Sequence, residues 1–270
     1  WLPLIVLATS GCAPILGVEE TRYENPDECV LMPTRVYFAE ALDHDADVVV
    51  AAITKLELAE LASDVDTELD PQLGHVVASI LDCTGDPLGA ASLGLDPLPG
   101  AATRFVIDAE GAQLATETSA LGLIGAFNLP TGGAIELQAL PQAISPLASS
   151  KAASVPMPAE LSAIALRPTS GLPAPTTPPQ ALVCVGTIAE PMTSATTIEL
   201  TVTVIEAQEL VPDGELLADI EVRACAEGDD ACSIVATTND DGVAILTLPV
   251  SQGRGFDGSI TIEGSHSDCP

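Results

Sequence analysis

Cysteine is the residue type in this chain whose number and spacing best indicate specific chemistry. The 270-residue sequence contains seven cysteines, and two of them, Cys225 and Cys232, flank the segment Ala226–Ala231. A segment of this length suits a loop between two strands, and residues at the base of such a loop are cross-strand partners. We therefore predict a Cys225–Cys232 disulfide, which would contribute only about 2 kcal/mol because the closed loop is short. The pairing of the remaining disulfide candidates is left open by the sequence: Cys29, Cys83, Cys184 and Cys269.

Metal binding is not indicated by these residues. The sequence has no Cys-x-x-Cys motif, and no histidine near the predicted pair completes a tetrahedral zinc site. Acidic residues cluster in Asp43–Asp47 and Asp64–Asp70 as they do in calcium loops, but the second cluster lacks the glycine of an EF-hand and has His75 where that loop needs glutamate. We predict no metal site. Calcium held between loops, with Asn239–Asp241 as ligands, is the open alternative.

Motifs of hydrolytic catalysis are missing from the sequence. It contains neither Gly-x-Ser-x-Gly nor His-Glu-x-x-His. The histidines His44, His75 and His266 are scattered, and each suits a surface or strand position better than the position of a general base. Carboxylates are so abundant that two close ones carry no information about glycoside hydrolysis. We therefore predict a protein that is not an enzyme, has no catalytic residues and uses no cofactor.

Carbohydrate binding would need exposed aromatic rings on which sugar faces stack. Aromatic residues make up only 3% of the chain, too few for an evident platform. Phe105 and Phe127 lie on apolar strand-like segments, where we expect them to be core residues. A glycan-binding module is therefore only an alternative to the structural role that we predict. The other rings that follow the N-terminal apolar run are Tyr23, Tyr37, Phe38 and Phe256.

The net charge excludes nucleic acid as a partner. The chain has 39 acidic and 8 basic residues, for a formal charge of −31. A phosphate backbone needs a Lys/Arg surface, and anionic lipid headgroups are disfavoured for the same reason. A charge of this size is expected to keep the protein soluble and unassociated, with a self-repulsion that salt relieves.

The first twelve residues indicate export and lipidation. Trp1–Ala8 is an apolar run too short to span a bilayer, and Thr9-Ser-Gly-Cys12 places small residues before a cysteine. This segment resembles the lipobox of bacterial lipoproteins, although Thr9 stands where leucine is usual. The resemblance implies that Cys12 is diacylated and anchors the protein to a membrane, which leaves six cysteines for disulfides in an oxidising compartment. No initiator Met precedes the run, so we expect a truncated start; an ordinary secretory signal is the alternative.

The rest of the chain predicts two β domains. We expect residues 13–45 to be an irregular tether, 46–167 a helix plus a first sandwich, 168–180 a Pro/Thr-rich linker, and 181–270 a second sandwich. Ala46–Ala62 is the predicted helix, although its valine run suits a strand equally. The expected strands of the first sandwich are His75–Cys83, Ala91–Leu95, Arg104–Ile107, Leu114–Thr118, Leu123–Leu129, Ala134–Leu140 and Leu161–Leu166. Those of the second are Ile198–Val204, Ile220–Ala224, two segments within Ala236–Pro249, and Ser259–Glu263.

An internal repeat relates the two halves. Thr116 and Thr237 each precede a glycine and an apolar strand that closes with Leu-Pro, the first copy being one residue longer on each side of its glycine. The turn Gly85–Ala90 and the segment Thr238–Gly242 resemble those of carboxypeptidase regulatory-like, or transthyretin-like, β-sandwich domains. The first copy, with Ser119–Gly122, lacks the acidic turn residue of that family. The resemblance implies an accessory module without catalytic residues.

The sequence thus predicts a mainly β protein with two small antiparallel sandwiches in tandem and a short helix before the first. We expect a cell-envelope lipoprotein at the outer membrane or surface of a bacterium, with a structural, adhesive or protein-contact role. Its partners would be the membrane, through the lipid on Cys12, and an unidentified protein or glycan. The alternatives are a calcium-dependent or carbohydrate-binding module, or an accessory part of a larger secreted enzyme that continues beyond Pro270.

Overall fold

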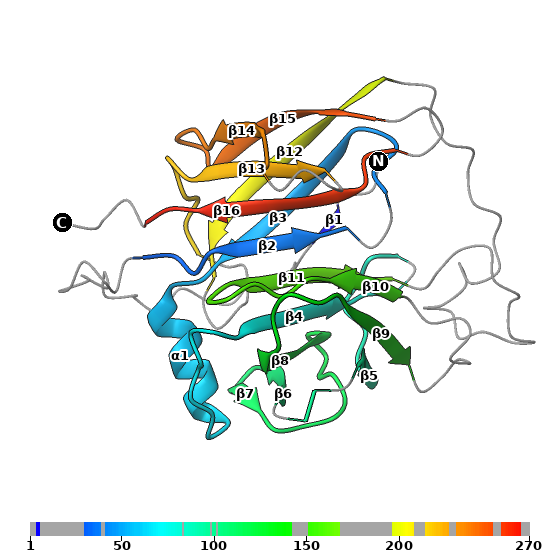
Figure 1. The fold of residues 1–270 in the computed structure, drawn as a ribbon, viewed down its shortest axis with the longest axis vertical. Helices are drawn as coiled ribbons and strands as arrows, with labels where there is room; N and C mark the ends of the chain where they lie inside the picture. The colour runs from blue at the N-terminus through cyan, green and yellow to red at the C-terminus, as the bar shows by residue number, and fades with distance from the viewer. Residues whose placement is uncertain are drawn as a thin grey trace, which may run out of the picture.

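The computed structural model shows a mainly β protein with one helix, α1, among the described residues (Figure 1). The structure describes residues 4–5, 30–38, 41–82, 84–97, 99–100, 102–141, 151–167, 196–207, 214–226, 231–250 and 255–265.

The described strands form three sheets. The largest has nine strands in the order β14 (Ile234–Thr237), β13 (Glu221–Ala226), β16 (Gly258–Glu263), β2 (Thr34–Tyr37), β11 (Leu161–Leu166), β4 (Gly74–Ile80), β8 (Leu123–Leu129), β6 (Thr103–Asp108) and β7 (Gly111–Gln113). The second has four strands in the order β1 (Leu4–Ile5), β3 (Ala46–Ala52), β12 (Thr197–Glu206) and β15 (Val243–Pro249). The third has three strands in the order β10 (Lys151–Ser154), β9 (Ile135–Pro141) and β5 (Ala91–Asp96).

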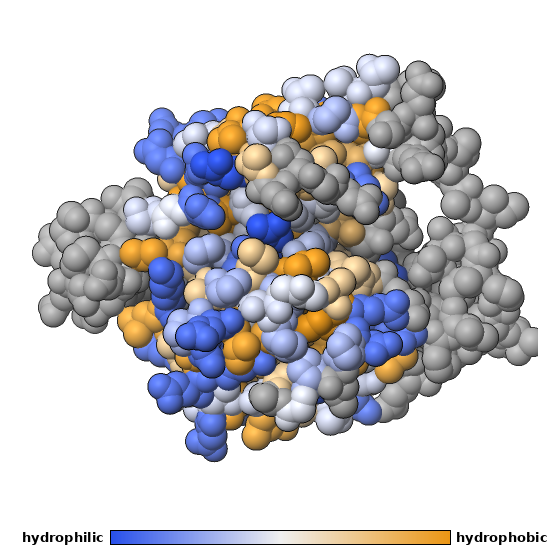
Figure 2. Space-filling model, viewed as in Figure 1, coloured by the Kyte–Doolittle hydropathy of each residue, from blue (hydrophilic) through white to orange (hydrophobic). Residues whose placement is uncertain are grey.

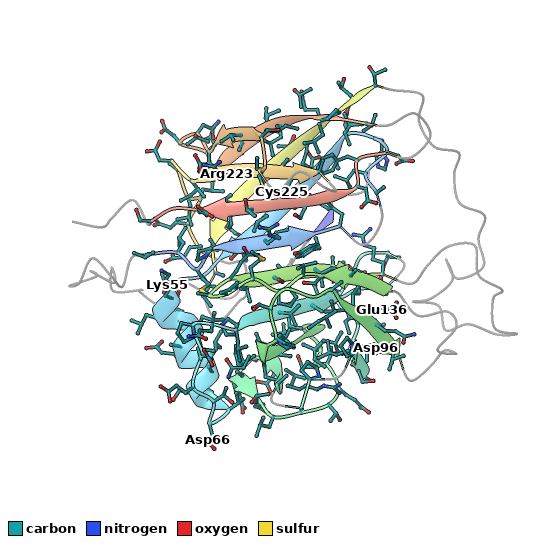
Figure 3. The ribbon with its side chains drawn as sticks, viewed as in Figure 1. Lys55, Asp66, Asp96, Glu136, Arg223 and Cys225 are labelled. Carbon is teal, nitrogen blue, oxygen red and sulfur yellow. A yellow bond between two sulfur atoms is a disulfide. The ribbon has the colours of Figure 1, made fainter. Side chains whose placement is uncertain are left out.

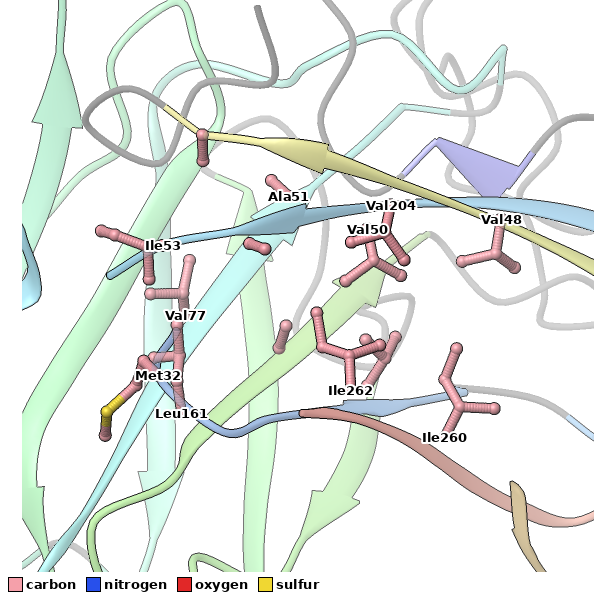
Figure 4. Close-up of a cluster of buried hydrophobic side chains, with 14 of the residues drawn as sticks. Met32, Val48, Val50, Ala51, Ile53, Val77, Leu161, Val204, Ile260 and Ile262 are labelled. Atoms are coloured by element: carbon pink, nitrogen blue, oxygen red, sulfur yellow. The ribbon is translucent and has the colours of Figure 1, made fainter. Parts of the chain in front are cut away.

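The nine-stranded sheet carries a hydrophobic core on each face. On one face it packs against the three-stranded sheet, with Val76, Leu93 and Leu137 in the shared core. On the other face it packs against the four-stranded sheet and α1 (Lys55–Asp64). Figure 4 shows Val48, Val50 and Val204 of the four-stranded sheet facing Ile260 and Ile262 of β16. Aliphatic side chains fill most of both cores, as the aromatic-poor composition requires.

The helix predicted over Ala46–Ala62 is wrong for its first half, which forms the strand β3. Its valine run forms a strand that pairs in parallel with β12, with Val48 opposite Val202. β-branched residues favour this outcome, because the pleated surface accommodates them better than a helix does. The helix begins only after Thr54, whose hydroxyl accepts the Glu57 N–H at 3.2 Å while the Glu57 carboxylate accepts the Thr54 N–H at 2.7 Å. This capping box places the helix start.

β2 lies in the segment that the sequence predicted to be an irregular tether, yet it is a central strand of the largest sheet. It lies between β16 and β11, antiparallel to the first and parallel to the second, and so joins the strands of the two halves into one sheet. The nine-stranded sheet is therefore mixed and continuous, whereas the sequence predicted two separate antiparallel sandwiches. A four-residue strand with ordinary flanks has no periodicity that sequence reasoning can detect, and its pairing is non-local. The proposed linker, residues 168–180, lies outside the described residues.

Most other strands form where the sequence predicts them, with one exception. Leu114–Thr118 is not a strand; the short strand there is β7, which ends at Gln113. Thr118 instead uses its hydroxyl as a cross-link: Oγ1 donates to the Leu88 carbonyl at 2.7 Å and accepts the Ala91 N–H at 3.1 Å. Its backbone also bonds to Ala90 and Ala91, so the residue ties the start of β5 to the turn before β8.

The hydroxyl of Thr238 forms the equivalent cross-link in the second half of the chain. Its Oγ1 donates to the Leu217 carbonyl at 2.7 Å and accepts the Ile220 N–H at 2.9 Å. Each threonine stands four residues before a glycine with positive φ: 68° at Gly122 and 67° at Gly242. In both places an added Cβ would lie within 3 Å of a carbonyl oxygen of the paired strand, that of Ile80 on β4 or of Val204 on β12, so a glycine is needed.

The internal repeat is therefore present, but in a different register from the one predicted. The equivalent residues are Thr118 and Thr238, and the distance from threonine to glycine is the same in both copies. The alignment on Thr116 and Thr237 is wrong, because the equivalence is set by which hydroxyl reaches the turn. The equal Thr-x-x-x-Gly spacing is visible in the sequence, and the hydroxyl contacts show that it marks the structural equivalence.

Candidate functional site

The predicted cysteine pair is present as a disulfide. Cys225 and Cys232 are bonded, with their Cα atoms 4.0 Å apart, and both side chains are buried. Cys225 lies within β13, where Figure 3 labels it beside Arg223 on the same strand. Cys12, the predicted lipidation site, lies outside the described residues, as do Cys29, Cys83, Cys184 and Cys269.

The described histidines do not come together. His44 is exposed, with Nδ1 2.6 Å from Asp43 Oδ1. His75 lies at the start of β4, buried by its neighbours. His266 lies outside the described residues. His44 thus has the surface position and His75 the strand position expected of such residues.

His75 is held in its neutral form by the fold. Its Nδ1 accepts the Asn128 N–H at 3.3 Å, which places the proton on Nε2, and its ring meets Phe127 edge to face at 5.9 Å. Burial lowers the pKa of His75 to about 4, against the opposing charge of Asp70. The imidazole is thus a buried core group.

The depressed pKa of His75 predicts a loss of stability in acid. Between the unfolded pKa near 6.5 and the folded pKa of about 4, the unfolded chain binds the proton more tightly, so the free energy of unfolding falls as the pH falls through this window. We expect this residue alone to account for about 3 kcal/mol. Urea unfolding at pH 4 to 7 measures it, with His75→Gln as the comparison. Parallel pH profiles for the two proteins would contradict the prediction.

Three of the candidate calcium-loop residues accept backbone N–H groups through their side chains. Asp45 Oδ1 accepts the Glu199 N–H and Asp70 Oδ1 accepts the Gln72 N–H, each at 2.8 Å. Asn239 Oδ1 accepts two N–H groups, from Asp241 at 3.0 Å and from Val243 at 2.9 Å. The bonds of Asp70 and Asn239 shape their own turns, whereas the bond of Asp45 joins the chain just before β3 to the distant strand β12. Within the described ranges, no group of three or more His, Cys, Asp or Glu side chains is placed to hold a metal ion.

The described aromatic rings pack inward. Phe105 and Phe127 are fully buried and stack at 4.0 Å, as expected of core residues. Phe256 is buried and meets Phe38 edge to face at 6.5 Å. The half-buried Tyr37 is anchored by its hydroxyl, which donates to the Val155 carbonyl at 2.9 Å and accepts the Val155 N–H at 3.1 Å. No exposed platform for sugar stacking forms among these rings.

Two arginines of the large sheet, one on β2 and one on β13, form ion pairs. Arg35 on β2 meets Glu160 at 2.9 Å, and Arg223 meets Glu221 at 2.6 Å. Burial raises the pKa of Glu160, and Arg35 opposes this shift. Figure 2 shows hydrophilic and hydrophobic residues interspersed on the visible part of one face. The described residues contain no helix long and apolar enough to cross a membrane.

Comparison with known proteins does not name a family. No family model and no curated protein matches the sequence. Two solved structures resemble this chain, both with low sequence identity and a low TM-score. The Bacillus anthracis TIE protein is 16% identical with a TM-score of 0.26 over 72% of this chain, and a streptococcal ancillary pilin is 12% identical with a TM-score of 0.25 over 74%. The chain spans about a third of the first protein (32%) and about three fifths of the second (61%). At these TM-scores neither match carries an argument.

Proposed function

We propose that this protein is a non-catalytic, lipid-anchored protein of the bacterial cell envelope, where its β sheets serve a structural, adhesive or protein-contact role. The observation that carries the proposal is the buried Cys225–Cys232 disulfide, because disulfides persist in oxidising compartments and are rare in the reducing cytosol. The apolar run that ends at Cys12 supplies the matching export and anchoring signal.

A structural role also agrees with how the described side chains are used. Among the described groups that could act in acid–base chemistry, His75 is buried singly and Asp70 is bonded within its own turn. The internal repeat gives two similarly built turn-and-strand units, stabilised by the hydroxyls of Thr118 and Thr238. Such a scaffold is suited to presenting surfaces at a distance from the membrane.

The anchor predicts where the protein is found in cells. In a bacterial host fed labelled palmitate, we expect the wild-type chain to carry label and to pellet with membranes, because diacylation supplies more than one lipid chain. Cys12→Ala is expected to lose the label and enter the soluble extracytoplasmic fraction. Cys29→Ala is the matched control and is expected to keep both. Equal labelling of wild type and Cys12→Ala would remove the anchor.

A further inference from the structure

We propose that the outer edge of β3 is a docking site for an extended, uncharged aliphatic segment of a partner protein. The segment adds to the four-stranded sheet as a strand parallel to β3 once residues 1–11 are removed from the chain. This inference deepens the proposed protein-contact role, and it rests on the processing before Cys12 that the proposed anchor requires.

The edge is defined by the register of β3 against β12. The Ala52 carbonyl accepts the Ala207 N–H at 2.7 Å and therefore points to the β12 side. Successive residues of a strand direct their backbone groups to opposite sides. The residues whose N–H and C=O point away from β12 are therefore Asp47, Val49 and Ala51.

β1 shows which kind of segment this edge accepts. Leu4 and Ile5 pair in parallel with Val48 and Val49, and no other described strand lies on this side of β3. β1 belongs to the apolar run that processing before Cys12 removes. The processed chain therefore presents the same backbone groups without β1, and an extended aliphatic segment of another protein can meet them as Leu4 and Ile5 do.

The edge of β3 is open where the other edge of the same sheet is closed. On β15, Val243 N–H donates to Asn239 Oδ1 at 2.9 Å and the Val243 carbonyl accepts the Asn239 N–H at 3.0 Å, so a turn covers the start of that edge. On β3 the corresponding contact comes only beyond the strand, where the Ile53 carbonyl accepts the Met32 N–H at 2.7 Å. β3 has seven residues and one charged side chain, Asp47, so it is neither short nor strongly charged.

Charge and burial select an uncharged occupant. The chain carries a formal charge of −31, which repels an acidic segment. Along the edge, Val49 is half-buried and Ala51 is buried, so the flank that a docked strand would line is apolar. A charged side chain placed there would lose water without gaining a partner. An aliphatic strand gains the backbone bonds without that cost.

Fluorescence anisotropy with a labelled peptide tests the site. The probe is Trp-Leu-Pro-Leu-Ile-Val-Leu-Ala, the sequence of residues 1–8, with a neutral Gly/Ser tail and a fluorescein label. The protein is the processed form, residues 12–270 with Cys12→Ala and its free thiols blocked with iodoacetamide; the removed residues include β1, which pairs with β3 alone. We expect a dissociation constant on the order of 50 µM.

The full chain is the first comparison. With Cys12→Ala it keeps residues 1–11, so its own β1 occupies the edge and competes at a high effective concentration. We expect it to bind the probe at least about tenfold more weakly than residues 12–270 do. A probe with Leu4→Asp and Ile5→Asp is expected to bind residues 12–270 at least about tenfold more weakly, because the protein is acidic.

Val49→Pro tests the edge itself, since it removes an N–H that points away from β12. We expect binding to weaken at least about tenfold. Ile245→Pro is the matched control, the same change at an outward-facing position on the opposite edge of the sheet, and is expected to bind as the unaltered protein does. Thermal unfolding followed by circular dichroism checks that each protein folds.

The proposal is overturned if residues 12–270 do not bind the probe at about 1 mM, or if the full chain binds it equally well. It is also overturned if a folded Val49→Pro protein keeps the affinity, if a folded Ile245→Pro protein loses it, or if the acidic probe binds as the original does. Should Val49→Pro not fold, the full chain and the acidic probe still decide. Loss of binding with palmitate labelling intact removes this site alone, whereas loss of labelling with binding intact removes the anchor alone.

Discussion

A fragment of residues 181–270, the second domain predicted from the sequence, is expected not to fold by itself. Its strand β12 pairs with β3 from Leu200 opposite Ala46 to Glu206 opposite Ala52, and its strand β16 pairs with β2. Both partner strands lie more than a hundred residues earlier in the chain. Without them, β12 and β16 lose one whole ladder each.

The fragment would also lose part of its hydrophobic core. Val36, Val48 and Val50 of β2 and β3 are all buried in the core that the four-stranded sheet shares with β13 and β16. Burying each contributes about 1.5–3 kcal/mol, and the whole stability of a domain is only about 5–15 kcal/mol. We therefore expect far-ultraviolet circular dichroism and amide NMR spectra of an unfolded chain.

Adding back the missing strands is the decisive comparison. Residues 30–54, fused ahead of 181–270 through a flexible linker, carry both β2 and β3 and are expected to restore a cooperative thermal transition. The same fusion with Val48→Asp and Val50→Asp is the matched control and is expected to stay unfolded, because it puts two charges into the core. A cooperative transition in the isolated 181–270 fragment would show that the second half is an independent domain.

Gly125→Ala is expected to destabilise the protein by about 3 kcal/mol. Gly125 lies on β8, opposite Val77 of β4 on one side and Phe105 of β6 on the other. A Cβ there would collide with the Val76 carbonyl oxygen and would lie 2.5 Å from Cζ of Phe105. The backbone cannot shift easily, since β8 is held between two strands, and the ring is stacked against Phe127.

Gly133→Ala is the matched control for this change. An added Cβ at Gly133 would meet nothing within 4 Å, so its effect is expected to stay within about 0.5 kcal/mol. Urea unfolding of the two variants beside the wild type gives both values. A Gly125→Ala protein as stable as Gly133→Ala would mean that the Phe105 ring does not occupy the space above Gly125.

Local features of this protein were predictable from the sequence. The alternation of Ile198, Leu200, Val202 and Val204 with polar residues predicted β12, and burial follows that pattern, with these apolar side chains in the core. The spacing of Cys225 and Cys232 predicted the disulfide for a similar reason, since the base of a short loop brings its ends together. Each of these features depends on residues close in the chain.

The sequence by itself also determined the β class, the acidic surface and the core built mainly from aliphatic residues, because these follow from composition and period. The tertiary structure alone decided that β2 and β3 complete the second half and that β2 joins the halves in one sheet. The physical reason is that strand pairing joins backbone groups, which every residue carries. The partner of a strand is therefore chosen by long-range packing, and a run such as Val48–Val50 becomes a strand only where β12 lies beside it.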